Sequence, residues 1–242
     1  MNYQTVSTFN MNFPKGRPKV SICIATFRKC KILDRVLREI HEKNKLCPFP
    51  YEVIVCDDCP NGSSFDVCKK HEARYIWNET SSLTKNPAKP RFLASRMALG
   101  EVVINMSDDV LFKSENIIEA FYEKVKEKVA VFATVLNVNP ITEEYIEDYT
   151  STNRQKPYFF CGAIFRKHLE EIGHQDLNYI FPAYDDDSLA KKLSRIGVDF
   201  VFDQDIICHH LNHPKNEMAD GSDSSVWFYN HYWQEKSTIF SG

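Results

Sequence analysis

The sequence predicts an α/β fold with a mostly parallel sheet flanked by helices. Over the first half of the 242-residue chain, short apolar runs alternate with segments whose apolar residues recur at helical spacing, and this alternation is typical of parallel sheets. Two predicted strands end in acidic pairs, Asp57 with Asp58 and Asp108 with Asp109. Because ligands bind at the carboxyl ends of strands in such sheets, the pairs predict a site for a divalent metal and a phosphorylated ligand, and hence an enzyme.

The elements of the first half follow in chain order. Residues 1–18 are polar and contain two prolines, which indicates an extended arm. Runs of β-branched and apolar residues predict strands at residues 20–25, 51–56, 74–77 and 102–106. Apolar spacing predicts helices at residues 31–44, 64–72 and 91–99. Residues 80–90 are polar and broken by prolines, so we expect a loop there.

The second half is less regular. Helices are predicted at residues 115–128, 168–172 and 188–196, and strands at residues 129–137, 158–165 and 200–208. Gly162 lies inside one of these strands and indicates a close approach by a neighbouring group. Residues 143–155 are acidic and poorly periodic, which predicts a loop, and residues 220–242 form an aromatic-rich tail. We expect this half to complete the same domain.

Composition limits the classes of function. The formal net charge is −3, which argues against non-specific nucleic-acid binding. No apolar run approaches the roughly 20 residues that a transmembrane helix needs. The first residues lack the basic and apolar regions of a signal peptide, so we expect a soluble, cytoplasmic protein with reduced thiols. The sequence does not define an oligomeric state.

Cysteine spacing offers an alternative function. Cys56 and Cys59, followed by Cys68 and His71, have the spacing of zinc ligands. A non-catalytic or zinc-stapled binding module on the same fold is therefore the alternative to an enzyme. The position of Cys56 inside a predicted buried strand and the short spacer weigh against it. A nucleotidylyltransferase is disfavoured because no glycine-rich phosphate loop follows the first strand.

Four motifs in order resemble the family 2 glycosyltransferases of the GT-A fold, over roughly residues 19–240. Residues 20–28 resemble the opening strand of that family, Val-Ser-Val-Ile-Ile-Pro-Thr-Tyr-Asn, with alanine in place of proline. Residues 53–64 resemble Val-Asp-Asp-x-Ser. Residues 91–109 resemble an Ala-Arg-Asn helix followed by a Gly-Glu turn and an Asp-x-Asp metal motif. Residues 184–193 resemble Glu-Asp-x-Asp-Leu-x-x-Arg-Leu, with aspartate in place of glutamate.

This resemblance implies a single Rossmann-like GT-A domain at residues 19–242, after an N-terminal arm at residues 1–18. Residues 19–112 would form the nucleotide-sugar-binding half. Residues 113–242 would form the mixed, acceptor-binding half and a C-terminal lid. The implied activity is metal-dependent, inverting transfer of a sugar from a nucleoside-diphosphate sugar to an acceptor hydroxyl. A UDP-sugar is the expected donor, and a glycan, a protein or a modified nucleic-acid base remain open as acceptors.

The resemblance also implies roles for individual residues on the donor side. A divalent ion, Mn²⁺ or Mg²⁺, neutralises the charge that builds on a departing diphosphate, and carboxylates suit both ions. Asp109 would be a direct ligand of this ion. The other expected donor contacts are Thr26 beside the nucleoside, Asp58 at the base, Asp108 at the ribose or the water shell of the ion, and Arg91 at the diphosphate.

Two further groups complete the expected site. Three adjacent aspartates at residues 185–187 repel one another, which favours the raised pKa that suits a general base. The family pattern makes Asp186 the base, with Asp185 beside it, and acids at a helix N-terminus are a compatible structural explanation. His209 and His210 end the last predicted strand, where the resemblance implies a further metal ligand. Imidazole would favour Mn²⁺ over Mg²⁺.

Overall fold

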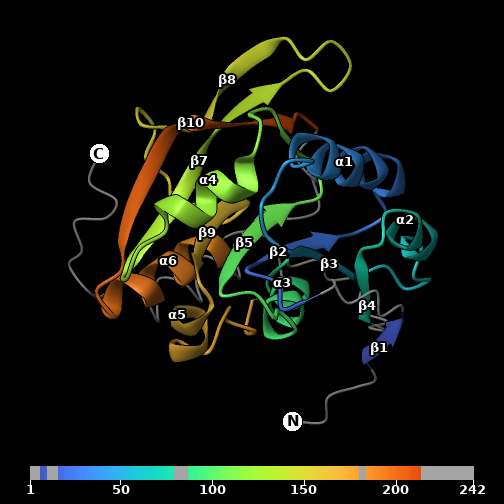
Figure 1. Ribbon diagram of the computed structural model, residues 1–242, viewed down its shortest axis with the longest axis horizontal. Coiled ribbons are helices and arrows are strands. Elements are labelled where there is room, and N and C mark those ends of the chain that lie inside the picture. The colour runs from blue at the N-terminus through green and yellow to red at the C-terminus, as the bar shows by residue number, and fades with distance from the viewer. Residues whose placement is uncertain (1–5, 10–15, 79–86, 180–183, 214–242) are drawn as a thin grey trace.

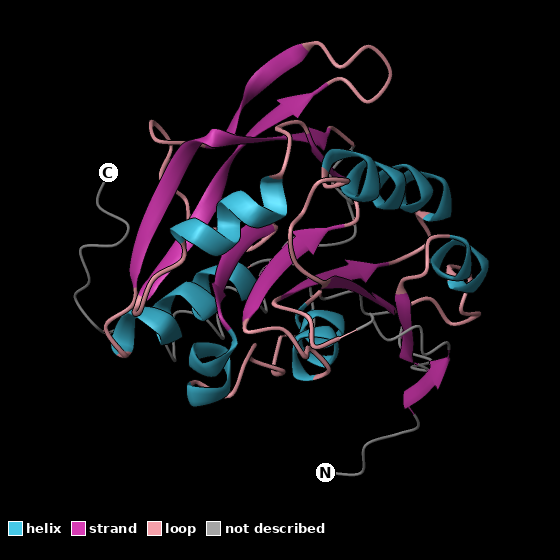
Figure 2. Cartoon of the chain, viewed as in Figure 1, coloured by secondary structure: helices cyan, strands magenta, loops and turns pink. Residues whose placement is uncertain are grey.

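The computed structural model describes residues 6–9, 16–78, 87–179 and 184–213. Its centre is one mixed ten-stranded sheet, with strands in the order β1-β4-β3-β2-β5-β9-β7-β10-β6 and with β8 paired to β7 (Figure 1). Helices lie on both faces of the sheet (Figure 2). The single α/β domain that the sequence predicts is confirmed.

The first half of the chain forms the parallel part of the sheet. Its strands are β2 (Val20–Thr26), β3 (Tyr51–Asp57), β4 (Arg74–Asn78) and β5 (Val102–Ser107). Its helices are α1 (Cys30–Lys43), α2 (Phe65–Lys70) and α3 (Ala88–Arg96). Strand β2 pairs in parallel with both β3 and β5, so these three strands end at the same edge. Every strand and helix predicted in this half is confirmed, with small shifts of the boundaries.

The second half forms the antiparallel and mixed part. Its strands are β6 (Val110–Phe112), β7 (Val129–Val138), β8 (Tyr145–Thr150), β9 (Cys161–Phe165) and β10 (Asp199–Leu211). Its helices are α4 (Ile117–Lys124), α5 (Arg166–Glu171) and α6 (Asp185–Arg195). Strand β9 runs antiparallel to β5 and so joins the two halves of the sheet. At Gly162 an added Cβ would lie 2.7 Å from the ring of Phe132, which confirms the predicted close approach.

Three predictions from the sequence are corrected. The acidic segment predicted as a loop contains β8, which has little apolar alternation because most of it is exposed and the hydrogen-bond ladder to β7 holds it. The predicted 80–90 loop overlaps α3, which begins at Ala88, since a proline is tolerated in the first helical turn. The arm contains strand β1 (Val6–Phe9), which pairs antiparallel with β4.

Some expectations lie outside the described residues, namely residues 79–86 of the loop region and the aromatic tail with its proposed lid. Across the described ranges, no helix combines the length and apolar character that crossing a bilayer requires.

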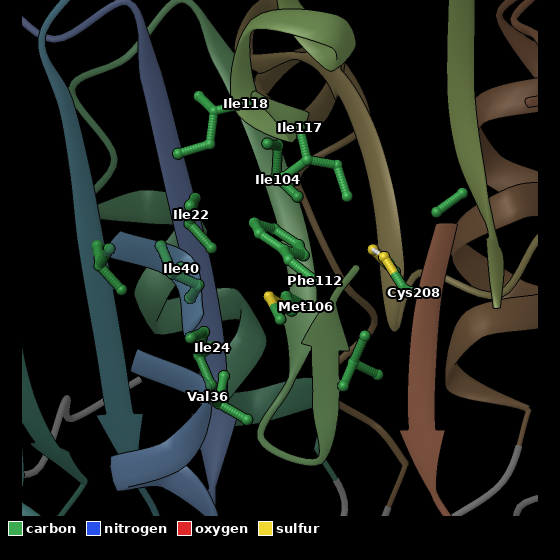
Figure 3. Close-up of a cluster of buried hydrophobic side chains, with 14 of the residues drawn as sticks. Ile22, Ile24, Val36, Ile40, Ile104, Met106, Phe112, Ile117, Ile118 and Cys208 are labelled. Carbon is green, nitrogen blue, oxygen red and sulfur yellow. Dashed lines mark hydrogen bonds between the residues drawn. The ribbon is translucent and has the colours of Figure 1, made fainter. Parts of the chain in front are cut away.

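Two buried clusters hold the sheet between its helices. Alternate residues of β2 contact opposite clusters, because side chains alternate across a strand: Ile22 and Ile24 face α1 and α4, while Cys23 faces α3 and α6. Figure 3 shows the first cluster, where Val36 and Ile40 of α1 meet these isoleucines. Full burial of each such side chain stabilises the fold by roughly 1.5–3 kcal/mol. The strand ends that carry the acidic residues are therefore fixed by a packed core.

Candidate functional site

The carboxyl ends of β2, β3 and β5 bring the first two acidic pairs together. In the sheet register Thr26 lies opposite Asp57, and Ala25 lies opposite Ser107. The Asp58 amide donates a 3.0 Å hydrogen bond to the Thr26 carbonyl, which fixes the two chain segments at this edge. The parallel register thus produces the arrangement that the sequence predicts.

The two aspartates after β3 have different environments. Asp57 is fully buried, and its carboxylate accepts hydrogen bonds from the Cys59 amide, the Ser64 amide and the Tyr75 hydroxyl. It therefore shapes the loop that follows the strand. Asp58 is 9% exposed and accepts a hydrogen bond from the Asn78 side-chain amide. Of the two, Asp58 is the one that borders solvent at the edge of the sheet.

Asp108 is held by the connection from β2 to α1. Its Oδ2 accepts a 2.8 Å hydrogen bond from the Thr26 hydroxyl and a 3.4 Å hydrogen bond from the Phe27 amide. Its Oδ1 lies 3.2 Å from Lys29 Nζ. Burial and the neighbouring charge of Asp109 raise the pKa of Asp108 to about 6.

Asp109 faces three basic side chains. Its Oδ2 lies 2.5 Å from Lys29 Nζ and 3.2 Å from His213 Nε2, and its Oδ1 lies 3.6 Å from His210 Nε2. Burial opposes its ionisation, but the hydrogen bond from His213 and the charge of Lys29 lower the pKa of Asp109 below its ordinary value. Asp109 Oδ1 is buried and, among the described residues, accepts no hydrogen bond.

Strand pairing brings His210 to Asp109. Strand β6 follows Asp109 directly and pairs antiparallel with β10, so His210 lies opposite Val110 and the Leu211 amide bonds to the Asp109 carbonyl at 2.9 Å. His210 Nδ1 lies 3.0 Å from the side-chain oxygen of Asn137, an acceptor, so Nδ1 carries the proton. The lone pair on Nε2 therefore faces Asp109. Burial lowers the pKa of His210, which favours this neutral form.

These groups form a candidate metal centre. One ligand atom each from Asp109, His210 and His213 lies within 4.8 Å of the other two, and within the described ranges this is the single such group. A buried carboxylate oxygen that accepts no hydrogen bond beside an imidazole lone pair suits a cation. One carboxylate and two imidazoles suit a first-row divalent ion better than Mg²⁺, and the Asn137 contact orients one imidazole as outer-shell partners do.

The structure separates the two predicted histidines. Neighbouring residues of a strand point to opposite faces, so His209 points away from Asp109 and its Nδ1 lies 2.9 Å from Glu143. His213 was not predicted from the sequence. The signal available was the His-x-x-His spacing of His210 and His213 just past the strand end.

The third acidic cluster is joined to this edge by Arg91. Asp185, Asp186 and Asp187 form the first turn of α6. Arg91 Nη1 lies 2.9 Å from Asp185 Oδ2 and 2.9 Å from Asp186 Oδ1, and its Nη2 donates to the Ser107 hydroxyl at 3.3 Å. The arginine expected at the diphosphate is therefore engaged by two aspartates here.

The three aspartates differ in exposure and in proton affinity. The side chain of Asp185 is 8% exposed and that of Asp186 is 17% exposed. Asp186 Oδ1 also accepts a 3.0 Å hydrogen bond from the Phe159 amide, which fixes the orientation of this carboxylate. Burial, and to a lesser extent the charge of Asp186, raises the pKa of Asp185 and of Asp187, and the pKa of Asp187 reaches about 6.

The alternative zinc site is not assembled. Cys56 belongs to the buried cluster on one face of the sheet and Cys68 to the cluster on the other. His71 Nε2 lies 2.9 Å from Asp34. These residues are also absent from the metal-binding groups found in the described part of the chain.

Comparison with known proteins gives the class. Residues 21–189 match the model of glycosyl transferase family 2. The chain therefore belongs to this family. No curated protein matches the sequence significantly.

Solved structures share the fold. Mannosyltransferase PcManGT from Pyrobaculum calidifontis, in complex with GDP-Man and Mn²⁺, aligns with a TM-score of 0.66 and 19% identity, covering 96% of this chain and 68% of that one. S. aureus TarS 1-349 aligns with a TM-score of 0.60 and 17% identity, covering 80% of this chain and 60% of that one. The TarS complex with UDP-GlcNAc has the same score and identity, covering 84% and 61%. The chain thus spans about 60% of TarS 1-349.

Proposed function

We propose that this glycosyltransferase is metal-dependent and inverting, and that it transfers a sugar from a nucleoside-diphosphate sugar to an acceptor hydroxyl. The observation that carries the metal dependence is Asp109 Oδ1, which is buried, accepts no hydrogen bond from the described residues and faces the Nε2 lone pair of His210 at 3.6 Å. Mn²⁺ is the ion we propose, because two imidazoles accompany the carboxylate. The Mn²⁺ in the PcManGT complex supports this choice.

Asp109, His210 and His213 would hold the ion. When bound, it would act as a Lewis acid that neutralises the charge on the departing diphosphate. Asp108 would bind the ribose or a water of the ion, from a position fixed by the Thr26 hydroxyl. Asp58, at the solvent border of the same edge, would accept a hydrogen bond from the base.

Asp186 is proposed as the general base. It is more exposed than Asp185, and the Arg91 guanidinium and the Phe159 amide orient its carboxylate. A fixed carboxylate can accept the proton of an acceptor hydroxyl as that oxygen attacks the anomeric carbon. Direct attack opposite the leaving diphosphate inverts the anomeric centre. Asp185 is proposed to support this base through their shared contact with Arg91.

A UDP-sugar remains the expected donor, and the complex of TarS with UDP-GlcNAc supports it. The GDP-Man in PcManGT makes GDP-sugars the second class to test. A glycan, a protein or a modified nucleic-acid base are the acceptor classes to test.

The test is a thermal-stability screen of UDP- and GDP-sugars with and without Mn²⁺, because a ligand that binds the native state raises its melting temperature. We expect stabilisation by one donor class that requires Mn²⁺, and slow Mn²⁺-dependent hydrolysis of that donor. Asp109→Ala should lose both effects, whereas Asp66→Ala, at an exposed position on α2, should keep them. Wild-type turnover by a folded Asp109→Ala variant would contradict the metal assignment.

A further inference from the structure

Lys29 lies between Asp109, the carboxylate of the proposed metal centre, and the neighbouring carboxylate of Asp108. Its Nζ is 2.5 Å from Asp109 Oδ2 and 3.2 Å from Asp108 Oδ1. Its side chain is 30% exposed, whereas those of Asp108 and Asp109 are 7% and 4% exposed. A flexible, solvent-accessible ammonium thus reaches into a buried pair of acids.

The local backbone directs Lys29 to this position. Arg28 has a φ of +56°, a left-handed conformation that is unfavourable for residues with a bulky side chain. Lys29 then occupies the N-cap position of α1, where its carbonyl accepts the Leu33 amide at 2.8 Å. The same connection binds Asp108 through Thr26 and Phe27. The whole connection therefore wraps around the acidic pair.

The acidic pair is matched by a cation in the ligand-free chain. Two carboxylates this deeply buried repel each other and lose hydration, so a nearby positive charge offsets both costs. Lys29 Nζ contacts one oxygen of each carboxylate and supplies that charge.

The ammonium and a divalent ion compete for the Asp109 carboxylate. Carboxylate oxygens bind such hard cations at about 2.0–2.1 Å. An ion on the unpartnered Oδ1 would lie within about 7 Å of the present Lys29 Nζ, and an ion that also binds Oδ2 would lie within about 5 Å of it. Two cations so close in a poorly hydrated site repel each other, which favours movement of the lysine when the ion binds.

We propose that Lys29 is a resident cation that is exchanged for the divalent ion when the donor binds, and that the released ammonium then binds the donor diphosphate. The inference rests on the proposed function, since it concerns the same metal centre. A diphosphate coordinated to the ion would lie within reach of a four-carbon side chain anchored at residue 29. The exchange makes ion binding depend on the nucleotide, because the diphosphate compensates for the displaced lysine.

The test measures Mn²⁺ affinity by calorimetry, and bound Mn²⁺ by paramagnetic resonance, with and without the nucleoside diphosphate, UDP or GDP, selected by the donor screen. We expect wild-type protein to bind Mn²⁺ weakly alone and tightly with the nucleotide. Lys29→Met should bind Mn²⁺ alone at least about tenfold more tightly, because a competing charge is gone. The same variant should bind the nucleotide–Mn²⁺ complex about tenfold more weakly, because the diphosphate loses a charged contact.

Matched variants separate the alternatives. Lys31→Met removes a charge from an exposed position two residues further along and should match the wild type. If Lys29→Met fails to fold, Lys29→Gln carries the same test, because it removes the charge and keeps a polar group. If the Lys29 variants bind Mn²⁺ alone as weakly as the wild type, or more weakly, the role proposed for Lys29 is wrong. In that case the proposed function still stands, provided that Asp109→Ala loses Mn²⁺ binding. Mn²⁺ binding that Asp109→Ala does not alter would contradict both.

Discussion

Arg91 and Asp186 are 95 positions apart in the chain, and Arg91 Nη1 lies 2.9 Å from Asp186 Oδ1. Through this contact α3, which belongs to the parallel half of the chain, is tied to α6 of the mixed half. Arg91 also contacts Ser107 at the end of β5, directly before Asp108 and Asp109. A single buried guanidinium therefore connects the proposed base to the strand that leads to Asp109, one of the proposed metal ligands.

Removing this guanidinium should destabilise the fold. Arg91→Met would leave Asp185 and Asp186 without their cation, and loss of one partner of a buried ion pair costs about 3–5 kcal/mol. Urea unfolding monitored by circular dichroism would measure the loss. Arg96→Met, at an exposed position on the same helix, should change the free energy of unfolding by less than about 0.5 kcal/mol. Equal stability of the two variants would show that the Arg91 ion pair contributes nothing.

Histidine substitutions should separate His210 and His213 from His209. Loss of an outer-shell partner typically lowers metal affinity about 10–100-fold, and loss of a direct ligand should cost at least as much. We therefore expect His210→Ala and His213→Ala each to weaken Mn²⁺ binding, measured by calorimetry in the presence of the nucleotide. His209→Ala should leave it near the wild-type value, because that side chain contacts Glu143. If only His209→Ala weakened Mn²⁺ binding strongly, His209 rather than His210 and His213 would be the metal ligand.

Local patterns were sufficient to predict the parallel half of the fold. The apolar period of α1 and the buried runs of β2 and β3 reflect the packing that those elements make. Strand β8 was mistaken for a loop because residues such as Tyr145 and Ile146 are exposed, so packing leaves no alternation to detect. Its conformation depends on pairing with β7, which sequence spacing does not encode.

The candidate site was predictable where it depends on strand ends. Parallel register brings Asp58, Asp108 and Asp109 to one edge, so the positions of these acids followed from the element pattern. The contacts of Lys29 and His213 with Asp109 depend on a left-handed turn and on the strand after Asp109, and neither feature was predicted. Long-range contacts of this kind follow from topology rather than from local composition.

Asp58→Ala should weaken donor binding and leave metal binding intact. The residue lies at the solvent border of the edge, and the hydrogen bond from a base to a carboxylate is worth about 1.5–3 kcal/mol, or roughly 10–100-fold in affinity. Calorimetric titration with the nucleotide would measure the loss, and titration with Mn²⁺ alone would serve as the control. An unchanged nucleotide affinity would exclude Asp58 from the contact with the base.

Asp187 should make stability depend on pH. Its pKa of about 6 in the folded chain lies above the value of about 3.9 of an ordinary aspartate. Ionised Asp187 therefore destabilises the fold; the penalty is complete above pH 6 and disappears as the pH falls below about 4. We expect Asp187→Asn to raise the free energy of unfolding by up to about 3 kcal/mol at pH 8 and to change it little at pH 4. Asp199→Asn, at an exposed position, should show no such pH-dependent gain in urea unfolding.

Substitution of the aspartates in α6 should identify the base. Asp186 is oriented by Arg91 and by the Phe159 amide, and the resemblance of residues 184–193 to the family pattern implies that it is the base. Removing a general base typically lowers the rate about 10²–10⁴-fold, so Asp186→Asn should lower kcat by this amount in a transfer or donor-hydrolysis assay. Nucleotide affinity and Mn²⁺ dependence should stay close to wild type, because the residue is proposed to face the acceptor.

Asp187→Asn provides the matched comparison, because it makes the same chemical change one position further along the helix. We expect its kcat to fall less than about tenfold, since losing a base costs about 10²–10⁴-fold and Asp187 is not the proposed base. Equal losses at both positions would mean that the acidic cluster acts as one coupled unit, as closely spaced carboxylates can. A large loss at Asp187 alone would move the base by one residue. That outcome would also assign catalysis to the carboxyl group whose pKa of about 6 lies closer to neutral pH.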